Sequence, residues 1–201
     1  SFQPLDAEGK ALALMRSWMS AMPGENVSCV GCHDHPGVAP PNANIRIALS
    51  QPVRAITPWR SPVRGFSFVR DVQPVLDKHC VGCHDGATNE RQGRKSALPD
   101  LRREQGGFVV YRGGQRDGQF LRQDQRELLG RYGAVFDPSY VALRQFVRVG
   151  GLESDLHLLP PREFGADTSE LIQMLAKGHH NVKLDAEAWD RLVTWIDLNA
   201  P

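Results

Sequence analysis

The sequence has no apolar run long enough to cross a bilayer, and its N-terminus lacks the basic and then apolar pattern of a secretory signal. It also lacks an excess of charge, because 24 Lys and Arg face 23 Asp and Glu. These charges are interleaved, which argues against a nucleic-acid-binding patch. With 41% hydrophobic residues over 201 positions, the composition is that of an ordinary globular protein of one large or two small domains.

Cysteine is scarce, and the four cysteines present all fall in two C-x-x-C-H motifs. This pattern is typical of covalent c-type haem attachment. The two thiols of a motif reach the two vinyl groups of one porphyrin, and the adjoining imidazole binds the iron as proximal ligand. The sequence therefore predicts two covalently bound haem c groups. The predicted haem-binding residues are Cys29, Cys32 and His33 in the first motif and Cys80, Cys83 and His84 in the second.

Two other chemistries use paired cysteines. A C-x-x-C pair can be a redox dithiol, and two such pairs can hold one zinc ion through four thiolates. A dithiol does not explain why a histidine follows both pairs, and an all-thiolate zinc site leaves both histidines without a role. Haem attachment accounts for all six residues, so it is the preferred interpretation.

Each iron needs a sixth ligand, and its identity separates electron transfer from chemistry on a substrate. His179 is the leading candidate for this ligand, since it follows Gly178, the expected end of a helix, and can project into a pocket from a rigid element. The lower-ranked alternatives are His180, His35 and His157. His35 lies two residues from His33, and about 7 Å of chain is too short to reach the opposite face of that haem. His79, directly before the second motif, is expected to be structural, and methionine and tyrosine ligands are weaker possibilities.

Helix signals recur along the chain. Apolar spacing and capping residues predict helices from Asp6 to about Met22, from Asp71 to just before Cys80, and from Asp137 to about Gly150. Two more are expected: one that follows a capping box at residues 167–170 and ends at Gly178, and one from about Asp185 onward, with Trp195 on its flank. The segment between the motifs is rich in proline and predicts irregular structure, and residues 106–114 predict a strand or hairpin arm.

These signals predict a mainly α fold, a cytochrome c-like dihaem unit with long irregular loops and at most a small β-hairpin. His33 and His84 lie 51 positions apart, which is short for a complete small cytochrome domain between them. We therefore expect residues 1–201 to form a single unit around both haems. In this unit residues 137–201 supply ligands and close the fold, and the whole is expected to be a piece of a larger protein.

Four segments carry a resemblance to a known family. They are Ser28 to His33, Arg70 to Cys80, Glu153 to Leu159, and the tail from Lys177 to Asn199. Together they resemble the dihaem cytochrome region of hydrazine synthase alpha-subunit-like proteins, the multi-domain cytochromes of planctomycete-type bacteria.

The resemblance implies distinct roles for the two haems. In the hydrazine-forming enzyme one haem of this region is catalytic and carries an unusual tyrosine on its iron, and the other is a bis-histidine electron-transfer haem. Carried over, His84 and His179 would be the bis-histidine pair, and His33 would bind the special haem. Residues 34–38, where the tyrosine is expected, contain none.

The functional prediction is a dihaem c-type cytochrome domain that transfers electrons to a redox partner or to other domains of the same polypeptide. The alternative is a haem enzyme in which an open site at His33 acts on a small nitrogen or oxygen compound, and a haem-based sensor ranks third. Haem c is attached outside the energy-transducing membrane, so a periplasmic or equivalent exported location is expected. The export signal would then lie upstream of Ser1.

Overall fold

A computed structural model of the chain describes residues 3–13, 22–25, 37, 51–52, 55, 57–86, 98–112, 118–125, 133–150 and 160–201. The chain divides into two compact units, one made of Ser1–Arg16 and Phe66–Pro201 and the other of Ser17–Gly65. All the helices and strands that the structure describes belong to the first unit. The first haem motif, His35 and His157 lie outside the described residues.

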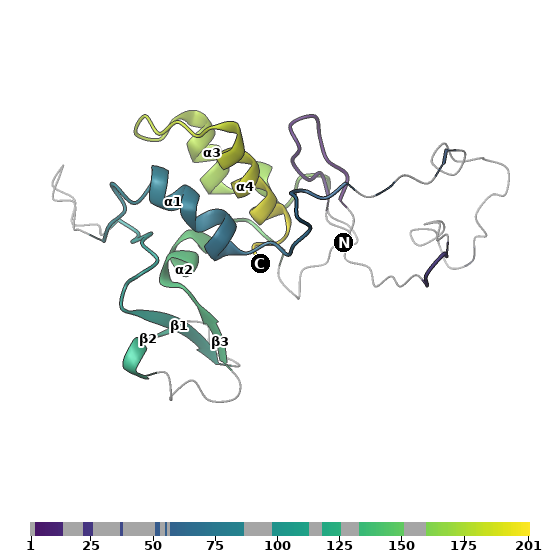
Figure 1. Ribbon diagram of the computed structural model, residues 1–201. Helices are drawn as coiled ribbons and strands as arrows, with labels where there is room; N and C mark the ends of the chain where they lie inside the picture. The colour runs from purple at the N-terminus through teal and green to yellow at the C-terminus, as the bar shows by residue number, and fades with distance from the viewer. Residues whose placement is uncertain are drawn as a thin grey trace. The chain divides into compact units, whose positions relative to one another are not determined.

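The first unit combines short helices with one small sheet (Figure 1). The helices are α1 (Gln73–His79), α2 (Pro138–Arg144), α3 (Glu170–Lys177) and α4 (Ala186–Asp197), with a π-helical turn at Phe68–Val72 and a 3₁₀ turn at Ala166–Thr168. The strands are β1 (Gly107–Arg112), β2 (Gln119–Arg122) and β3 (Gly133–Phe136), which form an antiparallel sheet in the order β2-β1-β3. No helix in the described part of the chain is long and apolar enough to cross a membrane.

The prediction of a mainly α, cytochrome c-like fold is wrong. The expected hairpin arm at residues 106–114 is the central strand of a three-stranded sheet. Phe108 and Val110 of β1 and Leu121 of β2 form a small buried cluster of their own. β2 and β3 are only four residues long and carry little periodic signal, so their pairing with β1 was not evident from local sequence.

Helix α1 delivers the second haem motif. Pro74 stands in its first turn, where a missing N–H costs nothing, and Val75 and Leu76 are buried. The helix ends at His79, and the Cys80 amide still donates to the Leu76 carbonyl at 2.8 Å. The predicted helix before the second motif is therefore confirmed, and the motif starts from a fixed point.

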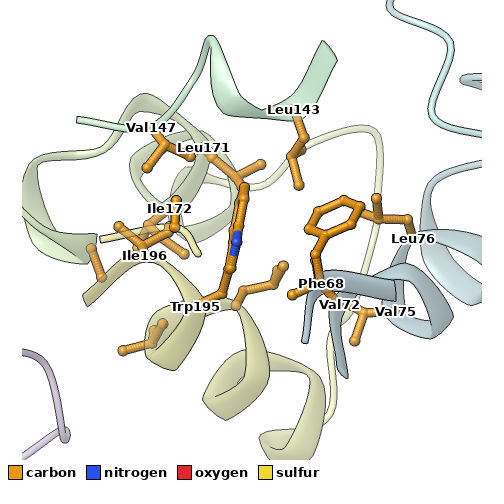
Figure 2. Close-up of a cluster of buried hydrophobic side chains, with 14 of the residues drawn as sticks. Phe68, Val72, Val75, Leu76, Leu143, Val147, Leu171, Ile172, Trp195 and Ile196 are labelled. Atoms are coloured by element: carbon orange, nitrogen blue, oxygen red, sulfur yellow. The ribbon is translucent and has the colours of Figure 1, made fainter. Parts of the chain in front are cut away.

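Trp195 lies at the centre of the main core, surrounded by side chains from several elements (Figure 2). It is fully buried, and its ring centroid is 5.3 Å from that of Phe68 and 6.0 Å from that of Tyr140. The expected flank position of Trp195 is therefore wrong, because the buried stripe of α4 runs through Ala188, Leu192 and Trp195. Such a stripe follows the helical repeat, and α4 contacts the Phe68–Val72 turn.

The expected helix from Asp6 is wrong over the described residues 3–13. The chain there forms a tight hairpin closed by a bridge between Leu5 and Ala11. The Asp6 carboxylate accepts hydrogen bonds from the amides of Glu8 and Lys10 at 3.0 and 2.9 Å. A side chain that satisfies nearby amides in this way favours a turn over a helix, although the same residue type is also a good helix N-cap.

Asp197 anchors this hairpin to the rest of the unit. Its side chain is buried at the end of α4, and its two oxygens accept the amides of Ala11 at 2.8 Å and Ala166 at 2.7 Å. Burial raises the pKa of Asp197, although both amide donors oppose the shift. Three segments far apart in the sequence therefore meet at one carboxylate.

We expect the Asp197→Asn substitution to lower the free energy of unfolding by about 1–3 kcal/mol at acidic pH, because an amide cannot accept from both donors. A raised folded-state pKa means that the folded protein binds this proton more tightly than the unfolded chain. The stability that the proton adds is complete below the unfolded pKa and is lost as pH rises through the folded pKa. The deficit of the variant should therefore shrink with rising pH.

Guanidinium unfolding across the acidic to neutral range measures this deficit. The control is Asp190→Asn, which changes an exposed carboxylate on the same helix and should show no comparable trend. A stability deficit of Asp197→Asn that grows with rising pH would contradict a raised folded-state pKa of Asp197.

Candidate functional site: the second haem motif and His179

The second C-x-x-C-H motif forms a tight turn at the end of α1. The amides of Cys83 and His84 both donate to the Cys80 carbonyl, at 3.1 and 3.0 Å. Cys80 is half-buried, Cys83 is exposed, and neither is in a disulfide. Burial raises the pKa of the Cys80 thiol to about 11, which is opposite to the activated thiolate of a redox dithiol. The raised pKa of Cys80 thus gives no support to the dithiol interpretation of this motif.

His84 is held in place by hydrogen bonds to residues 99–101. Its Nδ1 lies 3.1 Å from the Pro99 carbonyl oxygen, and its own backbone carbonyl accepts the Leu101 amide at 2.9 Å. A carbonyl can only accept, so Nδ1 carries the proton in this bond. The lone pair is then on Nε2, the nitrogen free to bind a metal.

His179 projects from a sharp turn after α3. Gly178 ends the helix with φ of +92°, a conformation that glycine adopts without strain. The next turn is closed by the Val182 amide, which donates to the His179 carbonyl at 2.8 Å, and His180 and Asn181 both have positive φ. The predicted placement of His179 after a helix end is confirmed.

The structure brings the rings of His84 and His179 close together. Their ring centroids are 6.0 Å apart, and the ring planes are inclined by 28°. Burial, His180 and His84 lower the pKa of His179, which favours the neutral imidazole that binds metals. A metal–imidazole bond of about 2.0 Å on each side of one ion would place two ring centroids roughly 6 Å apart. The spacing therefore fits two axial ligands of one iron.

The donor set at this site consists of the two histidines. Among the residues that the structure describes, no group of three or more His, Cys, Asp or Glu side chains is arranged to hold a metal. Two opposed histidines are sufficient for a haem, because the porphyrin supplies the other four nitrogens. Cys80 and Cys83, the cysteines that would attach the porphyrin, precede His84 directly in the chain.

The remaining histidines are not part of the pair formed by His84 and His179. His180 is exposed and contacts the His179 ring edge-on, with centroids 4.7 Å apart. His79 is half-buried at the end of α1, and its Nε2 has no hydrogen-bond partner among the described atoms. His33, His35 and His157 lie outside the described residues, so their predicted roles stay predictions.

Sequence reasoning missed the loop that supports His84. Pro99 acts through a backbone carbonyl, which every residue has, so its side chain gave no signal. Gly86, two residues after the motif, was a usable sign, because it has φ of +74° and a Cβ there would lie 2.5 Å from an Asp100 carboxylate oxygen. The positive φ favours glycine at this position, and a larger residue would displace the Asp100 side chain.

Comparison with known proteins gives two matches. A family described as the hydrazine synthase alpha subunit middle domain matches residues 1–34, a stretch that includes the first haem motif. The hydrazine synthase subunit alpha of Kuenenia stuttgartiensis is 27% identical over 151 residues, which cover 75% of this chain and 17% of that protein. The chain is similar to hydrazine synthase alpha subunits. No solved structure matches it.

These matches support the predicted relationship to hydrazine synthase alpha-like proteins. This chain spans about a sixth of the length of the curated relative, and the matching family is itself one domain of a larger subunit. The presence of two haems is not tested by either match and stays a prediction.

Proposed function

We propose that this chain is a dihaem c-type cytochrome region that transfers electrons within an exported, periplasmic protein related to hydrazine synthase. The observation that carries the proposal is the opposed pair of His84 and His179, with ring centroids 6.0 Å apart, next to the Cys80 and Cys83 thiols. The two cysteines would hold the porphyrin through thioether bonds, and the two histidines would bind its iron.

The bound haem would supply reversible one-electron chemistry at iron. Because both axial positions would be taken by His84 and His179, this site has no open position for a substrate, and electron transfer is the chemistry left to it. Cys83 is exposed and both histidines are only half-buried, so the motif lies at the surface of its unit. Such a position suits electron exchange with a partner protein or a neighbouring domain.

The second candidate function is a haem enzyme centred on His33. Two observations favour it: the matched relative is named hydrazine synthase, and the family match covers residues 29–33. In this case the haem at His33 would keep an open or weakly held sixth position and act on a small nitrogen or oxygen compound. The haem at His84 would then serve as its electron carrier.

Carbon monoxide titration of the reduced, full-length chain separates the two roles. We expect the haem at His84 to stay low-spin and not to bind CO, because both ligands are protein histidines. If neither haem binds CO, the chain is an electron carrier alone. If one of the two haems binds CO, the result supports an enzyme site at His33. CO binding to both haems, measured by absorption spectroscopy, would contradict the bis-histidine assignment.

A further inference from the structure

A buried polar chain runs through the unit behind the second motif, and it involves side chains with no part in haem attachment. Gln73 of α1 is 2% exposed and Ser139 of α2 is fully buried. The Ser139 hydroxyl donates to the Gln73 side-chain oxygen at 2.7 Å. The Gln73 side-chain nitrogen donates in turn to the Leu101 carbonyl at 3.0 Å and to an Asp77 carboxylate oxygen at 2.8 Å.

Leu101 connects this chain to the proximal histidine. Its amide donates to the His84 carbonyl at 2.9 Å, and Pro99, two residues earlier, presents its carbonyl to His84 Nδ1 at 3.1 Å. We call residues 99–101 the proximal strap. One side of the proximal strap holds both the backbone and the ring of His84, and the other is held by Gln73.

The hydrogen bond from Gln73 to Leu101 can hold the proximal strap in place. A buried polar group left without its partner is costly, and a strap that moved away would leave one Gln73 N–H and the Leu101 carbonyl without the hydrogen bond that they share. Ser139 restrains the Gln73 amide from a second helix. Because α1 also ends at His79, directly before Cys80, one helix determines the position of both the Cys80 thiol and the proximal strap.

We propose that Gln73 is a positioning residue for the haem at His84: through Leu101 it fixes the proximal strap, and the strap sets the orientation and basicity of the His84 ring. This inference rests on the proposed function. A hydrogen bond from Nδ1 to a carbonyl makes an imidazole a stronger electron donor to its metal. Stronger donation favours the ferric state, so loosening the strap should raise the reduction potential of this haem.

The test is a spectroelectrochemical titration of the dihaem chain carrying Gln73→Leu. We expect one of its two reduction potentials to shift upward, namely the one that belongs to the haem altered by His179→Ala, and the other to stay in place. Ser139→Ala removes only the support of Gln73 and should give a smaller upward shift. Amide hydrogen exchange should also become faster at Leu101 in both variants.

Two controls separate positioning from general destabilisation. Gln145→Leu makes the same chemical change at an exposed site beyond α2 and should leave both potentials unchanged. Leu143→Ala removes a core side chain that is 2% exposed and should lower stability without moving the potential. If Gln73→Leu does not fold, the Ser139→Ala result decides.

Unchanged potentials in a folded Gln73→Leu protein that retains both haems would overturn the inference and leave the proposed function intact. An equal shift in Leu143→Ala would also overturn it, because the effect would then follow stability. A chain without haem at the second motif, shown by pyridine haemochrome analysis of the unsubstituted protein, would instead overturn the proposed function.

Discussion

Replacing Cys80 and Cys83 together by serine should reduce the covalently bound haem from two groups per chain to one. Both thioether bonds of the second motif are lost in this variant, and the first motif is untouched. Pyridine haemochrome quantification and the intact mass of the chain measure the loss directly. The matched variant, Cys29→Ser with Cys32→Ser, should lose the other haem and retain the second.

The same pair of variants distinguishes haem from zinc. If the four cysteines held one zinc ion, either double substitution would remove all of the bound metal, because each contributes half of the ligands. Metal analysis that finds stoichiometric zinc, or an unsubstituted chain with the mass of the bare polypeptide, would contradict the haem assignment.

Replacing His179 by alanine should convert one of the two haems from a low-spin form to a high-spin or water-ligated form. The ring centroid of His179 is 6.0 Å from that of His84, and in the proposed site its removal would take away the sixth ligand of that iron. Absorption and EPR spectra of the ferric variant should show about half of the haem changed, since only one of two sites is affected. The altered haem should also acquire the ability to bind CO when it is reduced.

His180→Ala is the matched control for this experiment. His180 follows His179 directly, is exposed, and contacts it edge-on at 4.7 Å, so its loss changes the neighbourhood and not the opposed pair. The ferric spectrum of this variant should remain low-spin. If His180→Ala gave the high-spin form and His179→Ala did not, the ligand assignment would move to His180.

The helices near the site were predictable because local chemistry determines where they end. Asp185 caps α4 by accepting the Ala188 amide at 2.8 Å, and Gly178 ends α3 with a left-handed backbone. In each case the residues that carry the signal lie within one turn of the helix end. The position of His179 followed from such a signal and needed no knowledge of the tertiary fold.

The errors came from contacts between residues far apart in the chain. Asp6 could begin a helix or close a turn, and the hairpin it forms is held by Asp197, which is 191 positions away. The register of β1 with β3, in which Val110 lies opposite Val135, depends in the same way on distant segments. Local propensity does not show which distant segments pair, so the sequence alone predicted helices and loops where the chain forms a hairpin and a sheet.

The residues proposed to bind the haem could be predicted from the sequence, but the residues that hold His84 in place could not. The motif residues and His179 have side chains whose chemistry can be recognised from sequence alone. Pro99 acts through its carbonyl, and Gln73 is a common residue whose importance comes from its burial between α1, α2 and the proximal strap. Only the structure shows that Pro99 contacts the His84 ring and that Gln73 holds the proximal strap.

The most direct test of the central claim, that His84 and His179 bind one haem iron together, is near-infrared magnetic circular dichroism of the ferric, unsubstituted protein. The charge-transfer band in this region depends on the pair of axial ligands. We expect a band typical of two histidines that is absent in His179→Ala and retained in His180→Ala. A spectrum with no bis-histidine component, or one that survives in His179→Ala, would contradict the claim.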